Sequence, residues 1–380
     1  MKIGVIGVGR LGICFALLLE KAGYTVLGSD IRQDYVDLLN KKQIVTYEPQ
    51  VAELLADSKN FHVVADNKEV IKQCDIIYIM VATPSLPDGS YDVSAVWRAV
   101  DDLKQVDNVK GKLLVIGCTT NPGTCVEIQA SVRDLGVHVL YNPEFIAQGS
   151  IIRDLQRADI VLIGGEDQSA IDKFSTLYHD IQTSEVRINS MSLTAAEITK
   201  IAINCFSTTK ISIANWIGQV LIKSGLEQDV SKVTLAMGDD TRIGHKYLNF
   251  GFGYGGPCLP RDNRALAHYS KSLGIEFNLG FTVDSINKEH STFLRDYFIA
   301  KNVDKLPFYM PYITYKPNSD IIEESQQLKL CIDLLEMGYK VYVQDHYMIA
   351  STLKEKLNLI YGYMIKFVDK VDIPVYNISL

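Results

Sequence analysis

Residues 251–262 of this 380-residue chain, GFGYGGPCLPRD, hold four glycines, two prolines, one cysteine and one aspartate. Glycine lets a backbone adopt positive φ and approach a ligand closely, and proline fixes φ and lacks an N–H donor. The composition therefore predicts a shaped loop that presents Cys258, with Asp262 four residues further on. A cysteine in such a loop is a candidate nucleophile, whereas a structural cysteine is more typical of an apolar helix or strand. The loop alone leaves both interpretations open.

A second group of residues with recognisable chemistry opens the chain. The apolar run Lys2–Ile6 is followed by GVGRLG, a helical pattern, a second strand-like run and Asp30, which together make a complete dinucleotide fingerprint. We expect the turn to place a pyrophosphate at the helix N-terminus and Asp30 to accept hydrogen bonds from a ribose diol. Asp30 favours NAD, because its charge would repel the phosphate of NADP, and Arg32 is the one feature against that choice. The predicted cofactor turn comprises Gly7, Val8, Gly9, Arg10, Leu11 and Gly12.

Further strand-like runs over residues 75–81, 113–116, 137–141 and 160–163 alternate with helical patterns, which predicts a parallel sheet. Ligands of such sheets bind beyond the carboxyl ends of the strands. The pair Thr83–Pro84, Thr119 and Glu144 each follow one of these strands, so they could line a single crevice. The alternative is that each of them only caps a turn or a helix.

From residue 192 to about 224 the pattern becomes one long helix with many isoleucines. Lys200 and Asn204 are four residues apart and therefore share a face of it. A helical lysine is usually a solvated charge, but asparagine is mildly unfavourable inside a helix. The polar pair therefore suggests a functional face. From about residue 300 a βαβ pattern restarts, with strands expected over 309–315 and 340–344 and a helix over 325–337.

Length and composition predict a soluble protein of two or three domains. With the changes of pattern near residues 192 and 300, we place the divisions at 1–190, 191–298 and 299–380. The net charge of −7 argues against nucleic-acid binding, and no apolar stretch is long enough to span a bilayer. The strand-like start predicts that no leader precedes the fold. Seven scattered cysteines without a CxxC pair predict free thiols, a reducing cytoplasmic setting and no metal site.

Six spaced motifs resemble the UDP-glucose/GDP-mannose dehydrogenase family, over nearly the whole chain. They are GVGRLG at 7–12, VATP at 81–84, CTTNPG at 118–123, NPEF at 142–145, KxxxN at 200–204 and RIGHKYLNFGFGYGGPCLPRD at 242–262. The similarity is greatest to the members that oxidise UDP-glucose. It implies an N-terminal Rossmann NAD-binding domain, a central helical domain with a long dimer-forming helix, and a C-terminal Rossmann-like nucleotide-sugar domain.

The resemblance also implies a reaction. Two successive hydride transfers to NAD would convert UDP-glucose into UDP-glucuronate. Cys258 would capture the intermediate aldehyde as a thiohemiacetal, whose oxidation gives a thioester that water hydrolyses.

The resemblance assigns supporting roles to five other residues. Lys200 and Asn204 would stabilise the developing alkoxide and oxyanion. Asp262 would take part in proton transfer, and Glu144 with Thr119 would position or activate water.

Binding roles follow from the same resemblance. Arg242 would reach the sugar in the site of a neighbouring subunit of a homodimer, and Tyr247 and Lys316 would hold the pyrophosphate. The other positions expected at the sugar are Phe145, Lys200, Asn204, Phe250, Gly251, Tyr254 and Gly255. Those expected at NAD beyond the turn and Asp30 are Thr83, Pro84, Thr119 and Gln148.

Four positions depart from the family pattern. Gln148 replaces a glutamate, Arg261 a lysine, Tyr312 a glycine, and Glu323 an arginine that contacts the cofactor. Gln148 and Glu323 leave open a weakly active nucleotide-sugar-binding dimer. A dehydrogenase of a UDP-N-acetylhexosamine or GDP-mannose also stays open, because selectivity depends on a pocket shape that the sequence does not show.

Overall fold

The structure is a computed structural model that describes residues 1–146, 149–317, 319–344 and 349–380. The chain divides into two compact units, residues 1–200 and residues 201–380. Both units are α/β, with strands in parallel sheets and helices packed against them, as expected from the alternating sequence pattern.

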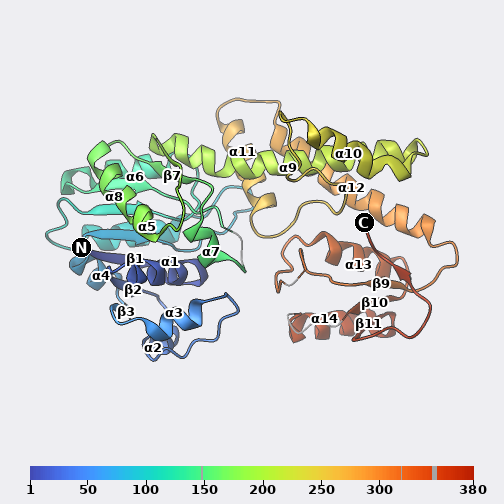
Figure 1. Cartoon of the computed structure of the whole chain (residues 1–380), viewed down its shortest axis with the longest axis horizontal. Coiled ribbons are helices and arrows are strands. Elements are labelled where there is room, and N and C mark those ends of the chain that lie inside the picture. The colour runs from blue at the N-terminus through green and yellow to red at the C-terminus, as the bar shows by residue number, and fades with distance from the viewer. Residues whose placement is uncertain (147–148, 318, 345–348) are drawn as a thin grey trace. The chain divides into compact units, whose positions relative to one another are not determined.

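The first unit is built on an eight-stranded sheet in the order β3-β2-β1-β4-β5-β6-β7-β8, which is the doubly wound Rossmann arrangement (Figure 1). One pair departs from the expected parallel direction, because β6 and β7 pair antiparallel through Tyr141 and Gly164. The strands are β1 (Lys2–Ile6), β2 (Thr25–Ser29), β3 (Phe61–Val64), β4 (Ile76–Ile79), β5 (Leu113–Ile116), β6 (His138–Tyr141), β7 (Val161–Gly164) and β8 (Ile188–Met191).

Helices cover both faces of this sheet (Figure 1). Strand β1 contributes Ile3 and Val5 to the core on one face and Ile6 to the core on the other, which explains its nearly continuous apolar sequence. The helices on the first face are α1 (Arg10–Lys21), α2 (Gln33–Asn40), α3 (Val51–Asp57), α7 (Ile151–Gln156) and α8 (Gln168–Ile181). Those on the second are α4 (Asn67–Gln73), α5 (Ser94–Lys104) and α6 (Thr124–Val132).

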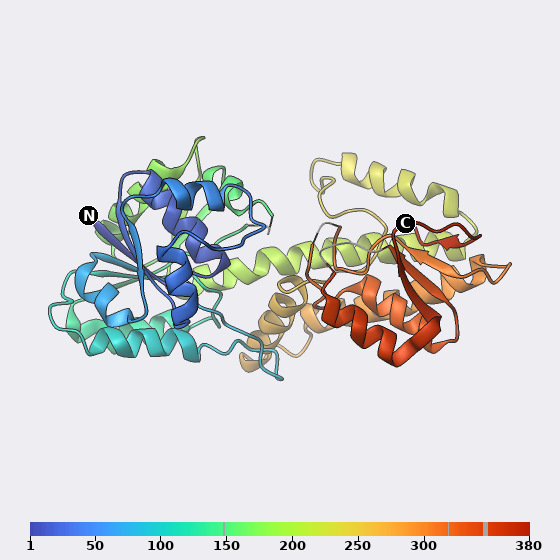
Figure 2. The same ribbon diagram turned by 90° about the horizontal axis from the view of Figure 1, so that it is seen from below.

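Helix α9 (Leu193–Lys223) has 31 residues and a length of about 46 Å. It is unbroken in both views (Figure 1, Figure 2). The boundary between the two units falls within it, after Lys200. The helix expected over residues 192–224 is therefore confirmed almost to the residue.

The second unit continues with α10 (Val230–Asp239), α11 (Leu259–Ser272) and α12 (Leu279–Lys301). A four-stranded parallel sheet in the order β11-β10-β9-β12 follows. Its elements are β9 (Phe308–Met310), α13 (Gln326–Glu336), β10 (Val341–Gln344), α14 (Ser351–Tyr361), β11 (Ile365–Val368) and β12 (Tyr376–Asn377). Short 3₁₀ turns occupy Arg133–Leu135, Glu227–Asp229 and Gly362–Met364.

Two expected elements of this unit have wrong limits. The strand expected over 309–315 ends at Met310, because Pro311 has no N–H for the sheet. The loop expected over 251–262 ends at Cys258, because α11 begins at Leu259 with Pro260 in its first turn, where a missing N–H costs nothing. None of the helices in the described parts of the chain is both long and apolar enough to cross a membrane.

Candidate active site

The turn between β1 and α1 has the shape that a dinucleotide needs. Gly7 has φ +92°, and a Cβ at Gly12 would lie 2.1 Å from the Gly7 carbonyl oxygen, so both positions require glycine. A Cβ at Gly9, by contrast, would meet no described atom within 4 Å. Gly9 is also the N-cap of α1 and supplies no side-chain cap. The open space in front of this helix N-terminus therefore fits the pyrophosphate of NAD.

The strand-end residues lie at one edge of the sheet. β4, β5 and β6 are parallel neighbours, so their carboxyl ends lie at the same edge of the sheet. Thr83, Thr119 and Glu144 each come after one of these ends, at the edge where α1 begins. Thr83 is buried, whereas Thr119 and Glu144 are half-buried. This is the edge at which the sequence predicted the crevice.

A buried carboxylate fixes the loop that carries Thr119. Glu197 of α9 is fully buried and accepts hydrogen bonds from the Thr120 hydroxyl (2.9 Å), the Gly123 N–H (2.6 Å) and the Cys125 N–H (2.9 Å). Burial raises the pKa of Glu197, and these donors counteract that rise. No role was predicted for Glu197 from the sequence. Its buried carboxylate holds the loop in position but is not exposed itself.

Two phenols surround Glu144. The Tyr178 hydroxyl lies 2.5 Å from Glu144 Oε1 and 2.5 Å from Asn142 Oδ1, and the Tyr78 hydroxyl lies 2.6 Å from the Asn142 carbonyl oxygen and 3.5 Å from Glu144 Oε1. Burial raises the pKa of Glu144 to about 7, although Tyr178, Lys200 and Tyr78 each lower it. Burial also raises the pKa of both tyrosines well above the ordinary value, so both remain protonated donors.

Lys200 is held beside the same segment. Its Nζ donates to the Glu144 carbonyl oxygen at 2.7 Å and lies 4.6 Å from the centre of the Phe145 ring. The first unit thus brings together Glu144, Phe145 and Lys200, three of the predicted site residues. Gln148 lies outside the described residues.

In the second unit Cys258 occupies the N-cap position of α11 and is exposed. The other six cysteines of the chain are buried. Burial raises the pKa of each of them, as the cases of Cys118 and Cys331, both to about 12, illustrate. A helix N-terminus favours negative charge and so favours a thiolate. Cys258 therefore has the location of a reactive thiol, unlike the rest.

Asp262 and Asn204 meet one turn from this thiol. Asn204 Nδ2 of α9 donates to Asp262 Oδ2 at 2.6 Å, and the Asp262 carboxylate is almost completely buried. The Asp262 N–H donates to the Cys258 carbonyl oxygen at 2.9 Å, in the first turn of α11. The predicted trio of thiol, carboxylate and amide is therefore contiguous.

The glycine loop before Cys258 is held by polar side chains from two helices. Asn215 of α9 accepts from the Gly251 N–H at 2.9 Å, and Asn287 of α12 binds both the N–H and the carbonyl oxygen of Tyr254. His290 Nε2 lies 2.7 Å from the Gly251 carbonyl oxygen, so Nε2 carries the proton. Burial lowers the pKa of His290, which favours this neutral form.

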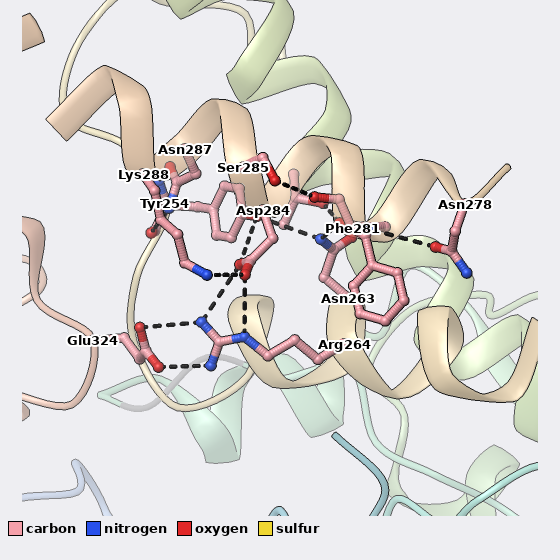
Figure 3. Close-up of polar contacts among 12 residues, drawn as sticks. Tyr254, Asn263, Arg264, Asn278, Phe281, Asp284, Ser285, Asn287, Lys288 and Glu324 are labelled. Carbon is pink, nitrogen blue, oxygen red and sulfur yellow. Dashed lines mark hydrogen bonds and ion pairs between the residues drawn. The ribbon is translucent and has the colours of Figure 1, made fainter. Parts of the chain in front are cut away.

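Figure 3 shows the polar cluster behind the loop, where Arg264 of α11 points at two carboxylates. Arg264 Nη1 donates to Glu324 Oε1 at 2.7 Å, and its Nε lies 3.4 Å from Asp284 Oδ2. The Tyr254 hydroxyl lies 3.3 Å from Asp284 Oδ1. A Cβ at Gly255 would lie 2.3 Å from the Glu324 carbonyl oxygen, so only glycine permits this contact.

A cavity of about 520 Å³ is lined in part by the start of the loop, at Gly251, Phe252 and Gly253. Its described lining combines aromatic rings, that of Tyr312 among them, with the cation Lys316. The lining residues are Gly251, Phe252, Gly253, Met310, Pro311, Tyr312, Tyr315, Lys316, Pro317, Gln327, Ile378, Ser379 and Leu380.

Gly251 and Lys316 line this cavity, whereas six other predicted sugar-site residues of the second unit do not: Asn204, Arg242, Tyr247, Phe250, Tyr254 and Gly255. Phe250 packs on Gly218 and on the His290 ring, and the Tyr254 side chain is buried towards Asp284. The side chains of Phe250 and Tyr254 therefore hold the loop in place from its buried side. Arg242 and Tyr247 are exposed, and Arg242 pairs with Asp240.

A Rossmann unit with an intact dinucleotide turn, followed by a long helix and a second parallel-sheet unit, defines an NAD-binding oxidoreductase. Residues 1–182 match the NAD binding domain of the UDP-glucose/GDP-mannose dehydrogenase family, and residues 194–289 match its central domain. The chain belongs to this family of nucleotide-sugar dehydrogenases.

Individual relatives agree with this assignment. The chain is 30% identical to the UDP-glucose 6-dehydrogenase TuaD of Bacillus subtilis, over 90% of this chain and 76% of that protein. A UDP-glucose dehydrogenase structure from Pyrobaculum islandicum superposes with a TM-score of 0.83 at 28% identity, covering 97% of this chain and 86% of that one. A UDP-D-ManNAc dehydrogenase from Pyrococcus horikoshii, at 24% identity and a TM-score of 0.78 over 90% of this chain and 83% of that one, shares the fold.

Proposed function

We propose that this chain oxidises UDP-glucose to UDP-glucuronate with NAD, through a covalent intermediate on Cys258. The observation that carries the proposal is the exposed thiol at the start of α11, next to the buried Asp262 that Asn204 holds. The names of the similar proteins from Bacillus subtilis and Pyrobaculum islandicum support UDP-glucose as the substrate.

NAD, when bound, accepts the hydride in each of the two oxidations. The substrate CH2OH loses a hydride and a proton to become an aldehyde, and Cys258 Sγ adds to its carbonyl carbon to give a thiohemiacetal. Loss of a second hydride and a proton leaves a thioester, and water then cleaves the C–S bond. The products are a carboxylate and the regenerated thiol, with two NADH formed and one water consumed.

The neighbouring residues support charge and proton movements. Lys200 supplies a fixed cation for the developing oxyanion. Asn204 uses one N–H on Asp262 and keeps a second for substrate oxygen, because an amide nitrogen has two. Asp262 exchanges the proton of the hydroxyl or thiol during addition. Glu144 removes a proton from the hydrolytic water, with Thr119 orienting it.

The nucleotide is held by the second unit. We assign its diphosphate to Lys316 and Tyr247, and its base and ribose to the cavity beside Gly251, where aromatic rings offer stacking surfaces. Arg242 extends to the site of a partner subunit. The division into domains at residues 1–190, 191–298 and 299–380 belongs to the same proposal, and the free thiols favour a cytoplasmic setting.

The stoichiometry of NADH tests this function. Purified protein incubated with limiting UDP-glucose and excess NAD is expected to form two NADH per sugar, read at 340 nm, together with UDP-glucuronate. Parallel reactions contain UDP-N-acetylglucosamine, UDP-N-acetylmannosamine or GDP-mannose. Faster turnover of one of these sugars contradicts UDP-glucose as the substrate, and no NADH from any sugar contradicts the enzyme proposal.

We further propose that α9 forms a homodimer. Phe206, Ile213 and Val220 recur at intervals of seven on this helix, with Trp216 beside them, and all four are exposed, Phe206 to 68% and Trp216 to 55%. Such a stripe is typical of a helix that packs against a partner. We expect the protein to have about twice the 42.5 kDa chain mass in light scattering, and the double variant Phe206→Glu/Trp216→Glu to be monomeric.

The control for this prediction is Leu359→Glu on α14. Leu359 is 87% exposed but lies outside the stripe, so its variant is expected to remain dimeric. A double variant that keeps the wild-type mass would place the interface elsewhere.

A further inference from the structure

The residue that should select the cofactor, Asp30, is already paired with an arginine. Arg32 Nε donates to Asp30 Oδ1 at 3.0 Å, Arg32 Nη2 donates to Oδ2 at 3.2 Å, and the Arg32 N–H donates to Oδ1 at 3.1 Å. The pair follows directly after β2, where the adenosine ribose binds in a Rossmann site. Both carboxylate oxygens therefore face a guanidinium.

An aromatic ring orients this guanidinium. Arg32 Cζ lies 4.3 Å from the centre of the Tyr35 ring, and the Tyr35 hydroxyl donates to the Val8 carbonyl oxygen at 3.2 Å. Because Val8 belongs to the glycine turn, the stack is attached to the cofactor site itself. The Arg32 side chain is 56% exposed and that of Asp30 only 9%, so the guanidinium is the group that faces solvent.

The two residue types have opposite effects on cofactor choice. An acid at this place binds the ribose 2′-hydroxyl of NAD and repels the 2′-phosphate of NADP, whereas a nearby arginine accommodates that phosphate. In this chain the two charges cancel locally, and Asp34 in the first turn of α2 is the next acidic group. Arg32 is the more exposed partner of the pair, so its guanidinium can also contact a doubly charged phosphate while it stays beside Asp30.

We propose that Arg32 makes the adenosine site of this chain bind NADP as well as NAD. The site keeps Asp30 for the ribose hydroxyls of NAD, and Arg32, held on the Tyr35 ring, supplies the cation for the 2′-phosphate of NADP. This proposal rests on the NAD-binding domain and on no particular sugar substrate.

Binding of the reduced cofactors tests the proposal without any turnover. The full chain is titrated with NADH and with NADPH, and nicotinamide fluorescence gives the two dissociation constants. We expect the constant for NADPH to be within about tenfold of that for NADH. In Arg32→Ser the dissociation constant for NADPH divided by that for NADH is expected to rise at least about tenfold. NADPH should bind more weakly because the cation for its phosphate is lost.

Two further variants separate the charge from the fold. Arg32→Lys keeps the positive charge but loses the paired N–H donors of the guanidinium and its stacking on the Tyr35 ring. Its ratio of the NADPH to the NADH dissociation constant is therefore expected between those of wild type and Arg32→Ser. Arg98→Ser removes an exposed arginine of α5 and is expected to change neither constant. The NADPH advantage conferred by Arg32 should also weaken with added salt, because it is a surface charge interaction.

The change in the ratio decides the outcome. If Arg32→Ser changes it by less than about threefold, the proposal is overturned. That holds equally if both cofactors weaken together, since Arg32 would then only hold Asp30 in place for NAD. Neither result bears on UDP-glucose oxidation, which the NADH stoichiometry tests separately.

Discussion

Replacing Cys258 by serine is expected to reduce formation of UDP-glucuronate by at least about a thousandfold. Serine has nearly the same shape, but its hydroxyl is far less acidic than a thiol, and the α11 N-terminus cannot make it an alkoxide at neutral pH. Because Cys258 is exposed, the substitution should change the free energy of unfolding by less than about 0.5 kcal/mol. Binding of NADH and UDP-glucose should stay within about twofold. Quenched product analysis, denaturant unfolding and calorimetric titration check these three statements.

Alkylation supplies an independent measurement on the unmodified chain. Iodoacetamide is expected to label one cysteine per native chain and to abolish turnover in step with labelling, because the other six thiols are buried and resist ionisation. UDP-glucose should protect that thiol. Wild-type turnover in Cys258→Ser, or inactivation without modification of Cys258, would exclude a covalent intermediate on this residue.

The parts of the site that sequence could predict are those with local causes. Gly7 and Gly12 are needed by the backbone of a single turn, and Cys258 and Asp262 lie in one loop and the helix turn that follows it. The helix start at Leu259 was missed, since a proline in a glycine-rich segment is typical of a loop. Only the structure shows that Pro260 lies in a first helical turn.

The parts that sequence could not predict depend on partners far apart in the chain. Tyr178 meets Glu144 across 34 residues, and Glu197 meets the Gly123 N–H across 74. Tyr178 lies on an amphipathic helix in which an aromatic residue is ordinary core, so nothing local marks it. Asn287 and His290 left a weak signal, because polar residues on the buried face of α12 are uncommon.

Glu323 is one of the positions where the sequence departs from the resemblance, and its effect on NAD binding stays a prediction. In the structure its carbonyl oxygen accepts from the Gly256 N–H at 3.1 Å. Any residue can make that backbone contact, so the support that this segment gives to the glycine loop does not depend on the side chain at position 323.

A further prediction with a large expected effect concerns the pH dependence of thioester hydrolysis. Glu144, the base that we propose for this step, can accept a proton only when it is deprotonated, and burial raises its pKa to about 7. The hydrolysis rate of the wild-type enzyme should therefore rise as pH increases through about 7 and level off above it. The Glu144→Gln variant has no group that titrates there, so its rate should be at least about a hundredfold lower and lack this rise.

In the Tyr178→Phe variant, the midpoint of this rise in hydrolysis rate should shift to higher pH. The Tyr178 hydroxyl donates to Glu144 Oε1 at 2.5 Å and lowers its pKa by stabilising the carboxylate. A hydrogen bond to a charged group is worth about 1.5–3 kcal/mol, so its loss should raise the midpoint by about one pH unit or more. At pH 7 hydrolysis should then fall several-fold, whereas at pH 9 it should approach the wild-type rate. Rapid-quench measurement of thioester decay across pH 6–9 checks both statements.

Tyr78→Phe is the matched control, because this tyrosine belongs to the same network but its hydroxyl is 3.5 Å from Glu144 Oε1. Its effect on the midpoint should be clearly smaller than that of Tyr178→Phe. An unchanged midpoint in Tyr178→Phe, with or without an equal loss of rate at every pH, would contradict the assignment of this titration to Glu144.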